Sequence, residues 1–185
     1  AETSARVVPD PGRPKARTIC IVPAAGAPLP ERFATELAAS MAAVQEVRLV
    51  TERTFREALG TDADADGADA LAWLNAQERT ADTVLFVAAT EADAWSRAVL
   101  RQSDHVILVA QAHRPAPPSE LEKLALELIA RDQRRLVLIH PHRMQRATGT
   151  AHWLASRPVF LHHHVALTED GADIARLARF LTGRA

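Results

Sequence analysis

The chain has 185 residues, of which 48% are hydrophobic and 24% charged, and its formal net charge is −1. A chain of this length can bury a core of its own, and this composition excludes intrinsic disorder and a membrane-embedded protein. Because there is no net positive charge to attract phosphate backbones or anionic lipids, we expect neither nucleic-acid binding nor direct membrane insertion.

The first residues differ in character from the rest of the chain. Pro9, Pro11, Gly12 and Pro14 lie among charged residues, so residues 1–17 are predicted to be a flexible lead-in linker. Residues 18–185 are predicted to form a single domain. Cys20 is the only cysteine, which excludes an internal disulfide and favours a cytoplasmic protein. It lies in an apolar run, where we expect a buried, protonated thiol.

Short apolar runs recur along the chain and are rich in β-branched residues. Because they are continuously apolar rather than alternating, they are typical of strands that are covered on both faces in a mainly parallel sheet. The six predicted strands are residues 18–22, 47–50, 83–89, 105–110, 135–139 and 159–166.

Helical patterns separate these runs. Apolar residues recur at helical spacing after the first run and across residues 68–79 and 92–102. Ser119 and Glu122 have the spacing of a capping box. Ile174, Leu177, Ala178 and Leu181 form an apolar stripe that precedes Gly183, a C-terminal glycine cap. The alternation predicts an α/β fold: a three-layer, doubly wound, Rossmann-like domain with a six-stranded sheet in the order 2-3-1-4-5-6. Its layout is similar to nucleotide-binding domains of the ParA/MinD type.

The loop after the first predicted strand is the usual position of a nucleotide site in such a fold. It contains Pro23, Ala24, Ala25 and Gly26, with two more prolines downstream. A phosphate-binding loop needs several glycines, a lysine and a serine or threonine, so this loop cannot be a working P-loop, and we expect no cofactor. A degenerate nucleotide or small-molecule site, formed by this loop and the ends of the third and fourth strands, remains an alternative.

Two other groups of residues are candidate metal sites. Residues 62–67 (DADADG) copy the first half of a calcium-binding loop, but position twelve is Trp73, so a capped helix start is favoured. Six of the eight histidines lie in the last third of the chain, and His140/His142 and His162/His164 are spaced to share one side of a strand. Since few other ligand residues accompany them, hydrogen bonding to neighbouring loops is favoured over metal binding.

The sequence contains no candidate nucleophile for a serine hydrolase. None of the serines lies in a Gly-x-Ser-x-Gly motif. Asp170, Gly171 and Ala172 resemble half of a serine–aspartate dyad, but they are better explained as a helix start. A hydrolase that acts through histidines and Asp170 is the weakest alternative, and we expect no catalytic residue in this chain.

The resemblance of this chain to a known family rests on the order of several short motifs rather than on any single one. The chain resembles the segment between the cyclic-nucleotide-binding-like domain and the patatin catalytic domain of bacterial relatives of neuropathy target esterase. The residues that carry the resemblance are His140-Pro141, residues 149–154, Arg157-Pro158, residues 162–165, residues 173–179 and residues 181–185, with a compatible opening at residues 18–24, 28–29 and 33–38.

The resemblance implies a larger protein, a serine esterase that cleaves phospholipids and lysophospholipids. Its catalytic residues would lie downstream of this chain and its cyclic-nucleotide pocket upstream. The resemblance therefore implies a non-catalytic regulatory domain that couples sensor to lipase inside a cytoplasmic, peripherally membrane-associated protein. Its partners would be those two domains, and the expected contact surface comprises Trp153, His162, His163, His164, Arg176 and Arg179.

Overall fold

The computed structural model describes residues 12, 14–143 and 148–183 and contains one sheet of six strands. All five strand pairings are parallel, and the order is β2-β3-β1-β4-β5-β6, as predicted. The strands are β1 (Arg17–Pro23), β2 (Val47–Val50), β3 (Thr83–Val87), β4 (His105–Gln111), β5 (Arg134–His140) and β6 (Leu161–Ala166). Because β2 and β6 end the order, they are the two edges of the sheet.

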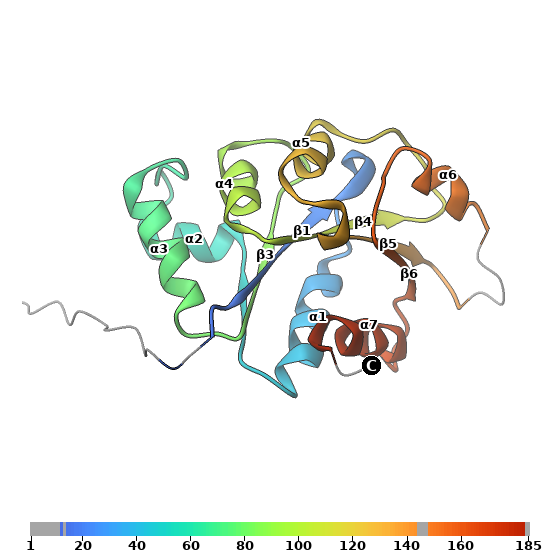
Figure 1. The fold of residues 1–185 in the computed structure, drawn as a ribbon, viewed down its shortest axis with the longest axis horizontal. Helices are drawn as coiled ribbons and strands as arrows, with labels where there is room; N and C mark the ends of the chain where they lie inside the picture. The colour runs from blue at the N-terminus through green and yellow to red at the C-terminus, as the bar shows by residue number, and fades with distance from the viewer. Residues whose placement is uncertain (1–11, 13, 144–147, 184–185) are drawn as a thin grey trace, which may run out of the picture.

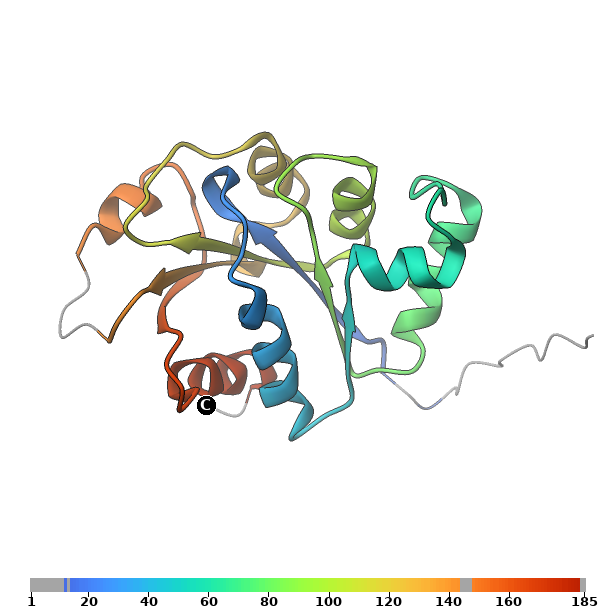
Figure 2. The ribbon, with the colours of Figure 1, turned by 180° about the vertical axis from the view of Figure 1, so that it is seen from behind.

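Helices cover both faces of the sheet, which makes three layers (Figures 1 and 2). One face carries α1 (Glu31–Ala42) and α7 (Ala172–Thr182). The other carries α2 (Glu52–Leu59), α3 (Ala68–Glu78), α4 (Ala94–Gln102), α5 (Glu120–Leu128) and the short α6 (Thr150–Leu154). Two 3-10 turns, η1 (Ala24–Gly26) and η2 (Arg131–Gln133), complete the elements. The three-layer, doubly wound prediction is confirmed.

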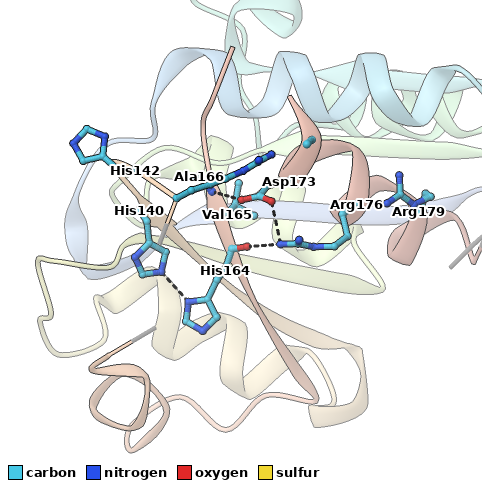
Figure 3. A pocket seen from close by; sticks show the side chains of 10 residues that line it. His140, His142, His164, Val165, Ala166, Asp173, Arg176 and Arg179 are labelled. Atoms are coloured by element: carbon cyan, nitrogen blue, oxygen red, sulfur yellow. Dashed lines mark hydrogen bonds and ion pairs between the residues drawn. The ribbon is translucent and has the colours of Figure 1, made fainter. Parts of the chain in front are cut away.

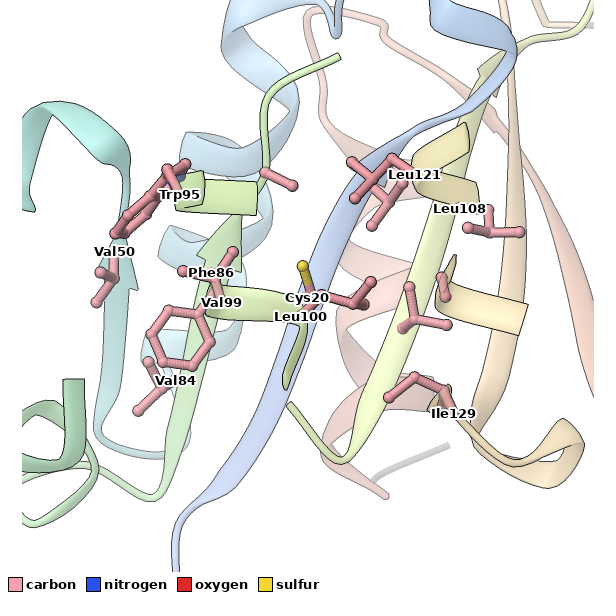
Figure 4. Packing of buried hydrophobic residues seen from close by; sticks show 14 of the residues in the cluster. Cys20, Val50, Val84, Phe86, Trp95, Val99, Leu100, Leu108, Leu121 and Ile129 are labelled. Atoms are coloured by element: carbon pink, nitrogen blue, oxygen red, sulfur yellow. The ribbon is translucent and has the colours of Figure 1, made fainter. Parts of the chain in front are cut away.

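The core divides into two clusters, one on each face, because successive strand residues point to opposite sides. In β1, Ile19 packs toward α1 and α7, whereas Cys20 packs toward α4 and α5 (Figure 4). Burial raises the pKa of the Cys20 thiol to about 12. The predicted burial of this thiol is confirmed, and its raised pKa favours the protonated form.

The helix ends form as the sequence indicates. The backbone N–H of Ser119 donates to Glu122 Oε2 (2.7 Å), and that of Glu122 donates to Ser119 Oγ (3.2 Å), which is a complete capping box. Gly183 ends α7 in the left-handed conformation, with φ of 70°. These local signals therefore fix where α5 begins and α7 ends.

The first strand, β1, begins at Arg17, and the division into a linker and a single domain stays a prediction. The lead-in prediction falls mostly on residues 1–11 and 13, which lie outside the described residues. Among the helices that are described, none has the length and apolar character needed to cross a bilayer.

Candidate functional site

The loop after β1 has the position of a phosphate-binding loop but a different local geometry. Ala25 is in the left-handed conformation, with φ of 58°, and Gly26 follows with φ of 65°. For a residue with a Cβ this conformation costs of order 1 kcal/mol and needs compensation from its surroundings. The backbone N–H of Ala25 provides some of it by donating to Glu122 Oε2 (2.9 Å). The backbone N–H of Ala25 is therefore already bonded to a carboxylate of the protein itself.

The carboxylate of Glu122 is held by a buried ion pair. Glu122 and Arg157 have side chains that are 0% and 1% exposed, and Arg157 Nε donates to Glu122 Oε1 (2.7 Å). Arg157 also donates to the carbonyl oxygen of Ala116 (2.9 Å), and its guanidinium lies 4.7 Å from the Trp153 ring centroid. The sequence indicated the capping role of Glu122 but not the pairing with Arg157, for which no sequence signal exists.

The alternative ligand site at the ends of the third and fourth strands is acidic. A cavity of about 460 Å³ lies there between the loop after β3 and the start of α5. Glu91, Asp93 and Glu120 are among the residues that line it, and no lysine or arginine is. Carboxylates repel a phosphate, so neither the β1 loop nor this cavity is suited to a nucleotide phosphate.

The histidines near the end of the chain are divided between the two faces of β6. His162 and His164 share one side, as predicted, with ring centroids 5.5 Å apart. His164 Nδ1 lies 2.8 Å from His140 Nε2, in a hydrogen bond that joins β6 to the last residue of β5. His163 points to the opposite face, where its ring packs on Phe180 and its Nε2 lies 3.0 Å from Arg135.

These contacts are hydrogen bonds and ring contacts between the histidines and neighbouring side chains. No group of three or more His, Cys, Asp or Glu side chains could hold a metal ion within residues 12, 14–143 and 148–183. The acidic loop also behaves as a helix start: Gly67 is the N-cap of α3, and Asp66 lies 4.0 Å from Arg97 and 3.8 Å from Arg101.

Burial favours the neutral form of three of these histidines, His140, His163 and His164. It lowers the pKa of His140 and of His164 below the ordinary value of 6.5. It also lowers the pKa of His163 to about 4, with further contributions from the charge of Arg135 and the neighbouring histidines. Near neutral pH these imidazoles therefore act as uncharged donors and acceptors.

The low pKa of His163 predicts acid sensitivity. Below pH 6.5 the unfolded chain takes up a proton at this residue that the folded chain resists until about pH 4, so stability falls across that interval. His163 is half-buried, and after allowance for solvent screening we expect a loss of about 1–2 kcal/mol. In His163→Gln, urea unfolding at several pH values should show a weaker decline. The exposed His152→Gln is the control, and a decline equal to that of the unsubstituted chain would contradict the assignment.

Trp153 lies apart from the other residues of the expected contact surface. It is 1% exposed, belongs to the core on the α5 face, and its indole N–H donates to the carbonyl oxygen of Ala112 (3.1 Å). Arg176 and Arg179 are exposed on α7, which covers the opposite face. At the end of the sheet that β6 forms, His163 packs on Phe180 of α7 and Arg176 donates to the carbonyl oxygen of His164 (3.1 Å), but the Trp153 side chain lies in the interior.

A cleft of about 500 Å³ lies at this end, at the carboxyl ends of β5 and β6 and along α7 (Figure 3). Its polar lining is mainly basic and consists of His140, His142, Arg143, His164, Arg176 and Arg179, together with one carboxylate. That carboxylate, Asp173, accepts the backbone N–H of Ala166 (2.9 Å) and pairs with Arg176 (3.2 Å). The sequence analysis named five of these residues as candidates, His140, His142, His164, Arg176 and Arg179, but it did not predict the cleft.

Asp170 lies beside this cleft in a helix-start turn, as predicted. Its carboxylate accepts the backbone N–H of Ala172 (3.1 Å) and pairs with Arg143 (3.2 Å). Hydrogen bonds, foremost that from the Thr168 hydroxyl, lower the pKa of Asp170. These bonds keep the group ionised as a cap at the start of α7.

Comparison with known families decides the identity of the chain. Residues 15–172 match the family described as "Neuropathy Target Esterase family P-loop like domain". The chain belongs to the neuropathy target esterase family. The resemblance noted at the level of residue order is thereby confirmed as to family, and the name of the domain agrees with a sheet of P-loop type whose phosphate loop is altered.

Curated relatives in the neuropathy target esterase family are much longer than this chain. "Neuropathy target esterase sws" of Drosophila mojavensis is 29% identical over 98% of the chain, which spans 14% of that protein. "Lysophospholipase NTE1" of Mycosarcoma maydis is 36% identical over 51% of the chain and 5% of its own length. "Patatin-like phospholipase domain-containing protein 7" of Rattus norvegicus is 26% identical over 83% of the chain, which spans 13% of that protein.

A solved structure supports the fold of this neuropathy target esterase family domain. A plasmid partition protein from Borrelia burgdorferi superposes with a TM-score of 0.52 and 14% identity, over 92% of this chain and 100% of that one. At this identity the likeness concerns the fold alone. It confirms the predicted similarity to ParA-type domains.

Proposed function

We propose that this chain is a non-catalytic regulatory domain of a patatin-like phospholipase of the neuropathy target esterase family. The observation that carries the proposal is the buried Glu122–Arg157 pair, whose carboxylate occupies the loop in which a working nucleotide-binding domain would hold phosphate. The chain keeps the fold of a nucleotide-binding domain, but the loop that would bind phosphate is already occupied. This favours a role in holding neighbouring domains in position or in transmitting changes between them. The activity of the larger protein on phospholipids or lysophospholipids is part of the same proposal.

The proposed partner is the patatin catalytic domain of the same polypeptide, with the cyclic-nucleotide-binding-like domain on the other side of the chain. The curated relatives support this because most of each lies outside the matched region. On this chain the proposed contact is the β6 edge, which we define as Phe160, Leu161, His162 and Phe180. Three of these are large, exposed hydrophobic residues.

The edge position of β6 strengthens this choice. β6 pairs only with β5 in the sheet, so one side of its backbone has no strand partner among the described residues. Another part of a protein can bind where an edge strand has unpaired backbone groups next to exposed aromatic side chains. The earlier expectation that Arg176 and Arg179 also belong to the contact stays a prediction, whereas the buried Trp153 is left out of it.

Hydrogen exchange tests the contact without relying on activity. The backbone amides of β6 that face away from β5 should exchange quickly in the 185-residue chain and at least tenfold more slowly in the full-length protein. Phe160→Ser with Phe180→Ser should abolish that added protection and alter hydrolysis of a short-chain ester by the full-length protein. Leu71→Ser, an equally exposed hydrophobic residue on α3, should do neither. Equal exchange in the two proteins would overturn the contact.

The alternative function is a degenerate nucleotide or small-molecule site at the loop around Gly26. A ligand at a hundred times its dissociation constant would stabilise the chain by about 2.7 kcal/mol, which thermal unfolding detects easily. Because Glu122 occupies the loop donor and the neighbouring cavity is acidic, we expect no shift with millimolar nucleotides. A shift that disappears on substitution of Gly26 would favour the alternative.

The proposed location follows from the larger protein. We propose a cytoplasmic protein that associates peripherally with membranes through regions outside this chain, consistent with the lone, buried cysteine.

A further inference from the structure

The ligand position of a doubly wound sheet is a crevice between strands whose following connections leave to opposite faces. This chain has such a point at β1, where α1 follows on one face while α5 follows the adjacent β4 on the other. A second occurs at β5 and β6, because α6 packs on the α5 face and α7 on the opposite one (Figures 1 and 2). The first point is closed by Glu122, whereas the second contains the cleft of about 500 Å³.

The lining of this second crevice is suited to an anion. Three guanidinium groups, those of Arg143, Arg176 and Arg179, line it with a single carboxylate, so the arginines alone give the lining a net positive charge. Asp173 is already engaged, since it orients Arg176 and accepts the N–H of Ala166. Arg176 Nη2 is fixed by a second bond, to the carbonyl oxygen of His164 (3.1 Å).

Among the arginines of the cleft, Arg179 makes the fewest interactions with other groups of the chain. Its guanidinium is exposed and has no ion pair or hydrogen bond to any group in the described part of the chain. It lies one turn of α7 beyond Arg176, so both project along the same helix face (Figure 3). Guanidinium forks match the geometry of phosphate oxygens. The rings of His140 and His164 are bonded to each other, and His164 Nε2 lies 3.4 Å from Thr150 Oγ1, so we take the guanidinium groups as the phosphate contacts.

We propose that the cleft between β5, β6 and α7 binds the phosphate group of a small phosphorylated ligand, with Arg176 and Arg179 as its cationic contacts. The volume of the cleft exceeds that of a bare phosphate and suits a compact phosphomonoester. The same chemistry is offered by a free compound and by the headgroup of a phospholipid. The site goes beyond the proposed regulatory role, because it requires no contact with another domain.

The test uses the 185-residue chain with ¹⁵N-labelled histidines. Titration with glycerol 3-phosphate and with inorganic phosphate should shift the imidazole signals of His140 and His164, and not that of His105 outside the cleft. Arg179→Gln should weaken this binding about tenfold, or about 1.4 kcal/mol. Arg53→Gln is the matched control, since Arg53 is an exposed arginine on α2, paired with Glu57 and far from the cleft.

Vesicles distinguish the two sources of the phosphate. Binding to phosphatidylcholine vesicles only when they contain phosphatidate, with loss in Arg179→Gln, would assign a lipid headgroup. Binding of glycerol 3-phosphate without vesicle binding would assign a free compound. The proposal is overturned if neither phosphate source shifts His140 or His164 and no vesicle binds, or if Arg53→Gln weakens binding as much as Arg179→Gln. The β6-edge variants Phe160→Ser and Phe180→Ser leave the cleft arginines in place, so this outcome is separate from that of the regulatory proposal.

Discussion

Arg157→Met should lower the free energy of unfolding by about 3–5 kcal/mol, because it leaves the fully buried carboxylate of Glu122 without its counter-charge. Methionine fills much of the volume of the arginine stem, so the loss comes mainly from the uncompensated charge and from the lost bond to Ala116. Urea unfolding near neutral pH, followed by circular dichroism, measures it.

Two companion variants separate the ion pair from simple packing. Glu122→Gln with Arg157→Met removes both charges and keeps an amide that can accept from Ser119 and Ala25. We expect this double variant to recover about half of the loss, since replacing both members of a buried pair is far less costly than removing one. Exposed Arg53→Met should change stability by less than about 0.5 kcal/mol. A double variant less stable than Arg157→Met would contradict the ion-pair explanation.

Most of the sheet could be predicted from the sequence because its strands are continuously apolar. The pattern gave the strand boundaries to within about two residues, and the alternation of elements gave the order of the strands. Two helices escaped prediction for physical reasons. α6 has only five residues, and α2 has eight, with only Phe55 buried, so neither shows an apolar stripe over several turns.

The candidate site was predictable only where it depends on local spacing. The period of two residues in a strand correctly placed His162 with His164, and the capping box correctly placed Glu122 at the start of α5. Contacts between distant segments were not predictable. Arg157 lies in a polar turn before a proline, and nothing local shows that it enters the core 35 residues from its partner. The cleft was not predictable for the same reason, because the strand ends and the helix that line it come together only in the folded chain.

Trp153 illustrates the difference between an unusual residue and an exposed one. Tryptophan is rare in this chain, and its place near the histidines suggested a contact role, yet the structure surrounds it with core residues on the α5 face. Trp153→Ala should therefore lower the free energy of unfolding by about 3–5 kcal/mol through lost burial and the cavity that remains. It would also remove the ring on which Arg157 packs.

A graded series tests this assignment of Trp153. Trp153→Phe keeps an aromatic ring but loses the N–H bond to Ala112, so it should cost about 1–2 kcal/mol, clearly less than Trp153→Ala. The exposed arginine Arg179→Gln should cost less than about 0.5 kcal/mol. If Trp153→Ala in the isolated chain were as mild as Arg179→Gln, the indole would not be a core group. Because the Arg157 guanidinium touches both the indole and Glu122, Trp153→Ala and Arg157→Met should be non-additive, with a combined loss smaller than the sum of the two single losses.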